Sequence, residues 1–287
     1  MSRNGSEPEG TDAATDVGQR AATERVRPVR AILFDKDGTL FDFRLTWIPI
    51  MREAALRLAA GDQALADRLL IAAGYDPHAD RFSSDGPIAA GTSDDIAAAW
   101  MRLMPNDRFP HGLRPDGSGE PQPQPLREIL DRDSLTLGPQ ASVPVCDLPR
   151  LLQTLRGAGL RLGLATSDTE SAAKATLQRF EILDCFDWIS GYDSGMGRKP
   201  SAAIVDRFAQ RVATDSHSVL VVGDTLHDLN MARAAGAMSA AVLTGAVERE
   251  ALAPYADVVL ESIADLPQLL GIGSGLAPAL RSAPCGR

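Results

Sequence analysis

The sequence is poor in cysteine. Its 287 residues contain three cysteines, Cys146, Cys185 and Cys285, and no two of them have the short spacing of a metal site. An odd number of widely separated cysteines also argues against a disulfide framework. The cysteine pattern therefore fits a reducing compartment, and we expect a cytoplasmic protein.

Long apolar runs and basic runs are missing as well. No apolar stretch approaches the ~20 residues that a membrane-spanning helix needs. The formal net charge is −9, and no basic block is present to neutralise nucleic-acid phosphates. Residues 1–28 lack the apolar segment of a secretory signal, and their polar composition predicts a disordered leader. These absences predict a protein with neither membrane nor nucleic-acid partners.

The chain does contain the material for a soluble enzyme. Hydrophobic residues make up 44% of it, enough for one large core and a smaller domain. Apolar runs that are typical of buried strands alternate with helical patterns. These runs begin at residue 31 and continue with 160–165, about 188–189, 218–222, 240–243 and 258–260. The alternation predicts an α/β fold with a doubly wound parallel sheet, similar to a Rossmann fold.

A helical segment interrupts this α/β pattern. After the first strand, apolar residues recur at helical spacing through about residue 103 without intervening strands. Two stretches rich in Pro and Gly, 74–91 and 105–125, are predicted to be loops. We therefore predict four parts: the leader 1–28, an α/β core formed by 29–43 and 146–270, a helical cap 44–145, and a flexible tail 271–287.

The stretch Ala31-Ile32-Leu33-Phe34-Asp35-Lys36-Asp37-Gly38-Thr39-Leu40 organises the rest of the chain. It predicts a buried strand that delivers Asp35 and Asp37 to its carboxyl end, where open α/β sheets bind ligands. Alternate residues of an extended strand face the same side, so both carboxylates can point at one ligand. By the same alternation Lys36 is expected to point away, and we assign it no catalytic role.

Other polar residues follow the neighbouring strands. Thr166 and Ser167 end one strand, and Asp224 with Asp228 follows another. A cluster of carboxylates repels itself, and a hard divalent cation such as Mg²⁺ relieves this repulsion while also binding phosphate. Lys199, in a loop before Pro200, adds a positive charge. This combination is typical of phosphoryl-transfer chemistry.

The chain resembles the haloacid dehalogenase superfamily of aspartyl-nucleophile phosphatases, in particular its phosphoglycolate phosphatase-like branch. Four motifs carry the resemblance in the expected order: Asp35-Lys36-Asp37-Gly38-Thr39, Thr166, Lys199-Pro200 and Gly223-Asp224-Thr225-Leu226-His227-Asp228. The resemblance covers residues 29–270, with the helical insertion in the place of that family's cap. It implies a Mg²⁺-dependent phosphatase for small phosphate monoesters.

The resemblance also implies a role for each motif residue. Asp35 is expected to attack phosphorus and Asp37 to act as the general acid and base. Mg²⁺ is expected at Asp35, the Asp37 carbonyl, Asp224 and Asp228. Phosphate is expected to bind at Asp37, Gly38, Thr166, Ser167 and Lys199, with Thr166 and Lys199 contributing to catalysis.

Substrate choice is expected to reside in the cap, because the core recognises only phosphate and metal. Arg44, Trp47 and Arg81 are the candidates for specificity. The two arginines are candidates for binding the carboxylate of a small acid such as phosphoglycolate.

Two alternatives remain open at this point. A phosphomutase with the same core would return the phosphoryl group to a second hydroxyl of a sugar phosphate. A regulatory module that binds a phosphorylated ligand would use the scaffold without catalysis, although such a module has no need of the acid Asp37. The sequence leaves the oligomeric state open.

Overall fold

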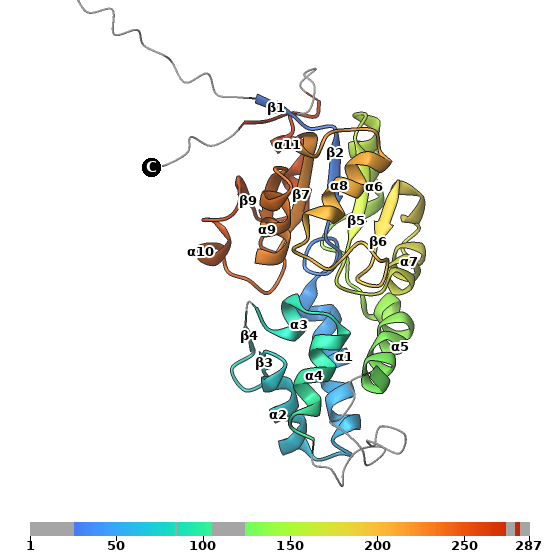
Figure 1. Ribbon diagram of the computed structural model, residues 1–287, viewed down its shortest axis with the longest axis vertical. Coiled ribbons are helices and arrows are strands. Elements are labelled where there is room, and N and C mark those ends of the chain that lie inside the picture. The colour runs from blue at the N-terminus through green and yellow to red at the C-terminus, as the bar shows by residue number, and fades with distance from the viewer. Residues whose placement is uncertain (1–25, 84, 105–123, 274–278, 282–287) are drawn as a thin grey trace, which may run out of the picture.

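The computed structural model describes residues 26–83, 85–104, 124–273 and 279–281. A parallel sheet with helices on both faces forms one part, and a bundle of helices at one end of the sheet forms the other (Figure 1). We call the first part the core and the second part, which includes helices α1 to α5, the cap. None of the described helices combines the length and the apolarity that crossing a lipid bilayer requires.

The core sheet has six strands in the order β6-β5-β2-β7-β8-β9, and all its neighbours pair in parallel. The strands are β2 (Ala31–Phe34), β5 (Arg161–Ala165), β6 (Trp188–Ser190), β7 (Val219–Gly223), β8 (Met238–Val242) and β9 (Val258–Leu260). The predicted α/β fold with a parallel sheet is confirmed. Strand β2 lies between β5 and β7, so the carboxyl ends of these strands form one continuous edge.

Both faces of the sheet are buried, as a continuous apolar strand requires. Ile32 and Phe34 of β2 pack toward a cluster that includes α6 (Leu148–Gly157) and α7 (Glu170–Arg179). Ala31 and Leu33 pack on the other face against α8 (Ala202–Arg211) and α9 (Leu226–Ala234). The remaining core helices are α10 (Arg249–Leu252) and α11 (Leu266–Leu269).

The cap has an apolar core of its own, centred on Trp100 and Tyr75, both fully buried. Its helices are α1 (Phe43–Leu58), α2 (Gln63–Ala72), α3 (Pro87–Ala90), α4 (Ser93–Met101) and α5 (Gln124–Ala141). The chain enters and leaves the cap through two adjacent backbone segments, 40–42 and 143–145, which we call the hinge. The Asp42 amide donates to the Val143 carbonyl, and the Val145 amide donates to the Leu40 carbonyl. Helix α5 also packs against α7 of the core, so the two parts touch beyond this hinge.

The structure differs from the sequence predictions in three places. The cap contains a short antiparallel pair, β3 (Tyr75–Asp76) with β4 (Arg81–Phe82), where only helices and loops were predicted. Helix α5 begins at Gln124, inside the predicted loop 105–125, most of which lies outside the described residues.

The third difference concerns the chain ends. Strand β1 (Val26–Pro28) pairs antiparallel with β10 (Ala279–Arg281), whereas the sequence predicts a disordered leader and a loose tail there. The pairing satisfies backbone groups of segments that are far apart in sequence, which local composition does not reveal. The rest of the leader and most of the tail lie outside the described residues.

Candidate active site

Strand β2 ends at Phe34, and the backbone then turns tightly to place Asp35 and Asp37 at the edge of the sheet. Gly38 makes this turn with a φ of 84°, and a Cβ there would lie 2.2 Å from Oδ2 of Asp224. Only glycine therefore lets the turn approach Asp224 so closely. The Thr244 hydroxyl donates to the Gly38 carbonyl at 2.6 Å and fixes the turn.

The other two acidic residues come from the end of β7 and the start of α9. Thr225 is the N-cap residue of α9. Its hydroxyl donates to Oδ2 of Asp228 at 2.6 Å, so this N-cap residue also orients the Asp228 carboxylate. Carboxylate oxygens of Asp35, Asp224 and Asp228 all lie within 4.8 Å of one another. Three buried acids thus share one small volume at the sheet edge.

Lys199 lies in the middle of this acidic cluster. Its ammonium donates to Asp35 at 2.5 Å and to Asp228 at 2.7 Å, and its side chain is almost fully buried. Burial alone would lower the pKa of Lys199, but the Asp228 and Asp35 charges outweigh it and hold the pKa above its usual value. Lys199 is therefore a fixed positive charge beside the predicted nucleophile.

The electrostatics of the cluster fit a divalent cation. Burial raises the pKa of Asp35 to about 7 despite the opposing effect of Lys199. Burial and the neighbouring Asp35 charge also raise the pKa of Asp224, whose Oδ2 is buried without a hydrogen-bond partner among the described residues. An unpartnered carboxylate oxygen between two other acids is what a Mg²⁺ ion, with its preference for oxygen ligands, would complete.

Lys36 does not point away from the site, so that prediction is wrong. Its ammonium lies 2.6 Å from Asp168 and 3.2 Å from Asp37, and the side chain is 1% exposed. The reason is that β2 ends at Phe34, so the alternation of an extended strand no longer applies at residues 35–37. Burial raises the pKa of Asp37, while Lys36 and a hydrogen bond from Trp47 act in the opposite direction.

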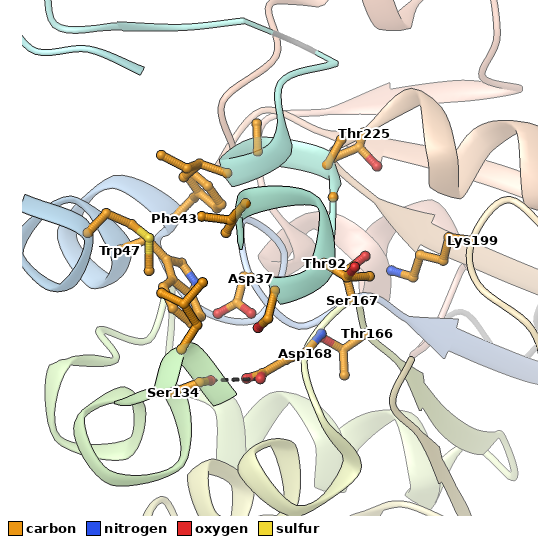
Figure 2. Close-up of a pocket in the computed structure, with 18 of the residues that line it drawn as sticks. Asp37, Phe43, Trp47, Thr92, Ser134, Thr166, Ser167, Asp168, Lys199 and Thr225 are labelled. Carbon is orange, nitrogen blue, oxygen red and sulfur yellow. Dashed lines mark hydrogen bonds between the residues drawn. The ribbon is translucent and has the colours of Figure 1, made fainter. Parts of the chain in front are cut away.

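Sequence reasoning missed two residues of this network. Asp168 follows Thr166 and Ser167 at the end of β5, and its second oxygen accepts a 2.6 Å hydrogen bond from the Ser134 hydroxyl of α5 (Figure 2). The unusual lysine inside the first motif was a signal that a buried acid must face it. No sequence signal pointed to Ser134.

A cavity opens between the sheet edge and the cap helices (Figure 2). Asp35, Asp37, Thr166, Ser167 and Lys199 line its core side, so the structure brings these predicted residues together. Trp47 lines its cap side.

The structure does not bring Arg44 or Arg81 to the cavity. Arg44 is paired at 2.5 Å with Asp80 on the exposed face of the cap, and the exposed Arg81 lies in β4. The prediction that these arginines bind a substrate carboxylate is therefore not supported by their positions, because neither lines the cavity.

A second, smaller cavity adjoins the first: the two share six lining residues, among them Thr166 and Lys199, and the second is also lined by Arg198 and His227. The Arg198 guanidinium forms an ion pair with Asp94 of α4. Sequence analysis identified the loop that carries Arg198 but assigned this residue no role.

A parallel sheet with acids and a buried lysine at one edge, and a helical cap above them, defines a class of phosphoryl-transfer enzymes. The sequence profile of the haloacid dehalogenase-like hydrolases matches residues 29–236. The chain therefore belongs to the haloacid dehalogenase-like hydrolase family, and the predicted family is confirmed.

Relatives across almost the whole chain agree with this assignment. The phosphoglycolate phosphatase of Salmonella typhimurium is 27% identical over 254 residues, covering 87% of this chain and 95% of the relative. The phosphoglycolate phosphatase of Escherichia coli K12 is 27% identical over 249 residues, covering 85% and 93%. These similarities bear out the predicted phosphoric monoester hydrolase of the phosphoglycolate phosphatase-like branch.

Solved structures show the same fold. A haloacid dehalogenase-like hydrolase from Bacteroides fragilis superposes with a TM-score of 0.63 at 18% identity, covering 83% of this chain and 99% of the other. CbbY from Rhodobacter sphaeroides, solved in complex with phosphate, superposes with a TM-score of 0.56 at 22% identity, covering 83% and 96%.

Proposed function

We propose that the protein is a Mg²⁺-dependent phosphatase that hydrolyses small phosphate monoesters through an aspartyl-phosphate on Asp35. The observation that carries this proposal is the position of Asp35 between a buried cation, Lys199, and two further buried acids, Asp224 and Asp228. A binding module would gain nothing from this crowding of acids. A phosphatase uses it to hold a metal beside a nucleophile.

In this proposal, phosphate is bound by positive charge from two sources, the metal ion and Lys199. Asp35, Asp224 and Asp228, with the Asp37 carbonyl, would hold Mg²⁺, which when bound offsets the negative charge of the phosphoryl oxygens. Lys199 supplies a second positive charge from the protein itself.

Hydrogen-bond donors at the sheet edge complete the phosphate site. Thr166 and Ser167 line the cavity, and we assign their hydroxyls to the phosphoryl oxygens together with the turn amide at Asp37. The Gly38 amide, which was also predicted to bind phosphate, instead donates to the Phe41 carbonyl at 2.7 Å.

The reaction then proceeds in two halves. A carboxylate oxygen of Asp35 attacks phosphorus, the bond from phosphorus to the ester oxygen breaks, and Asp37 donates a proton to the departing alcohol. Water next attacks the phosphorus of the aspartyl-phosphate and gives a proton to Asp37, the bond from phosphorus to the Asp35 oxygen breaks, and inorganic phosphate leaves with Asp35 restored as a carboxylate. Burial raises the pKa of Asp37, which helps this carboxyl to carry a proton.

Phosphoglycolate is the first substrate to test, because the relatives named above are phosphoglycolate phosphatases. The test is phosphate release from a panel of monoesters with and without Mg²⁺. We expect Mg²⁺-dependent release by the parent protein, almost none by Asp35→Asn, and parent-like release by Asp184→Asn, an acid that does not line the cavity.

The panel also separates the alternatives. Interconversion of sugar phosphate isomers without phosphate release would replace the proposal with a phosphomutase. Tight binding of phosphate esters with no turnover of any of them would leave a binding module. Parent-like turnover by Asp35→Asn would remove Asp35 as the nucleophile.

A further inference from the structure

The cavity has two chemically different ends. Its core end carries the phosphate-binding and acidic groups described above. Its cap end is lined by large apolar side chains from four different helices: Phe43, Trp47, Met51, Ile88, Ile96 and Leu130. Figure 2 shows Phe43 and Trp47 on the α1 side, with Asp37 seen between Trp47 and Lys199. A phosphate held at the core end would direct its alcohol toward these apolar side chains.

Helix α1 explains why this end is apolar. Phe43, Trp47 and Met51 recur every four residues, so they form one face of the helix, and this face is turned toward the sheet edge. Phe43 and Met51 also pack into the apolar core of the cap, and Trp47 packs against that core. Here part of that face borders a cavity whose non-protein space, including its open mouth, is about 680 Å³.

The described lining offers no unpaired cation to a substrate whose alcohol portion carries a carboxylate. Lys199 is the one lysine or arginine among the described residues that line the cavity, and Asp35 and Asp228 already hold it. Asp37 and Asp168 belong to the same wall, and the buried Lys36 ammonium is already paired with both of them. A carboxylate placed here would lose its hydration without gaining an unpaired cation as a partner.

The amino end of α4, which also borders the cavity, does not supply a positive charge for a substrate carboxylate. A helix amino terminus attracts anions, but Asp94 and Asp95 already occupy the first turn of this helix. The Thr92 amide and hydroxyl both donate to Asp95 at 2.8 Å. These donors are therefore engaged within the protein.

Arg198, which lines the neighbouring cavity, is the strongest alternative partner for a substrate carboxylate. Its guanidinium is paired with Asp94 and lies 3.9 Å from Asp95, so two acids offset its charge. A substrate carboxylate would have to displace them.

We propose that this enzyme prefers phosphate monoesters of uncharged, apolar alcohols over esters of small hydroxy acids such as phosphoglycolate. This inference rests on the proposed phosphatase function and specifies its substrate class. The alcohol is bound by the apolar cap end, and the phosphate by the core end. Each methylene group buried against these side chains is worth about threefold to fourfold in binding.

The decisive comparison uses two esters of equal chain length, butyl phosphate and the phosphate ester of 4-hydroxybutanoate, which differ by a carboxylate. We expect kcat/KM to favour butyl phosphate by about tenfold or more, because the carboxylate is desolvated without a partner. We also expect kcat/KM to rise about threefold per methylene from ethyl to butyl phosphate. These alcohols have similar acidity, so the trend reports binding and not chemistry.

Two variants on one helix locate the effect. Leu130→Ala, at the cavity wall, should flatten the dependence on chain length, whereas Leu135→Ala, at an exposed position of α5, should leave it unchanged. If Leu130→Ala does not fold, the ester comparison with the unaltered protein still decides the question.

The outcomes separate this inference from the proposed function. Faster hydrolysis of phosphoglycolate and the carboxylate ester than of alkyl phosphates would overturn the inference and leave the phosphatase intact. Loss of that advantage in Arg198→Ala would then assign the carboxylate to the neighbouring cavity. Failure to hydrolyse any phosphate monoester would refute the proposed function itself.

Discussion

The Lys36 ammonium donates a 2.6 Å hydrogen bond to the Asp168 carboxylate, and both side chains are buried. Lys36 belongs to the turn that carries the proposed nucleophile and acid, whereas Asp168 follows the neighbouring strand β5. Asp168 also accepts from Ser134 of the cap helix α5. The buried ion pair therefore joins the first motif to the adjacent strand end, and the Ser134 hydrogen bond joins that strand end to the cap.

Breaking this ion pair should destabilise the protein more than removing it whole. Lys36→Met or Asp168→Leu alone leaves one buried charge without its partner and should cost about 3–5 kcal/mol of unfolding free energy. The double variant Lys36→Met/Asp168→Leu should cost clearly less than the sum of the two single changes. Denaturant unfolding of all four proteins measures this coupling. Additive losses would show that the pair is not coupled as the distance implies.

Ser134 should hold the cap in place over the site. Ser134→Ala removes a hydrogen bond to a carboxylate, which typically contributes about 1.5–3 kcal/mol. We expect faster amide hydrogen exchange in α5 and a higher KM. Thr136→Ala is the matched control, because the exposed Thr136 hydroxyl bonds only within its own helix. Equal exchange rates in the two variants would leave Ser134 without a positioning role.

Much of the site could be predicted from the sequence, because its residues sit at strand ends. Asp35, Thr166 and Asp224 follow β2, β5 and β7, and adjacent parallel strands bring their carboxyl ends to one edge. Apolar runs locate such strands without knowledge of tertiary contacts. A residue that directly follows one of these strands can thus be placed at the carboxyl edge of the sheet from the sequence alone.

The contacts between distant segments could not be predicted in this way. Lys36 reaches Asp168 across 132 positions of the chain, and Arg198 reaches Asp94 across 104. The orientation of Lys36 was also misjudged because the strand ends one residue before Asp35. Arg44 is similarly bound by Asp80, a partner that no periodicity reveals. Long-range ion pairs decide which charges remain available to a ligand.

Asp37→Asn should slow the reaction in a way that depends on the leaving group. Loss of general acid catalysis typically costs about 10²- to 10⁴-fold. Aryl phosphates have leaving groups that need little help from a proton, so their deficit should be smaller than that of alkyl phosphates. Steady-state kinetics with phenyl and alkyl phosphates measures the difference. An equal loss on both classes of ester would argue against the acid role of Asp37.

Lys199→Ala should impair both binding and turnover. The ammonium lies beside the proposed nucleophile Asp35 and, in the proposed mechanism, would face the phosphoryl group in the transition state, so kcat/KM should fall by about 10²- to 10³-fold. Lys199→Arg should not restore activity, because a planar fork does not replace a compact charge held by two carboxylates. Lys174→Ala, at a lysine paired on the surface with Glu170, is the control. Unchanged kinetics in Lys199→Ala would place this lysine outside the reaction.

The stability of the metal-free protein should fall as pH rises through the range in which Asp35 titrates. Burial raises the pKa of Asp35 to about 7 in the folded protein, whereas an unfolded chain has a value of about 3.9. Between these two values the folded state binds more protons than the unfolded state. The linkage relation then requires stability to decrease with pH across this window.

Mg²⁺ should reverse this trend, because it binds the ionised carboxylates and must displace their protons. At a hundredfold excess over its dissociation constant, the ion should add about 2.7 kcal/mol of stability. We expect a larger increase in the unfolding midpoint at pH 7.5 than at pH 5. Asp35→Asn, which cannot ionise, isolates the contribution of Asp35: in EDTA the parent protein should lose stability relative to this variant between pH 4 and 7. A constant difference between the two proteins across that range, measured by thermal unfolding, would show that the Asp35 carboxyl titrates normally and would remove the electrostatic argument for a cation at this site.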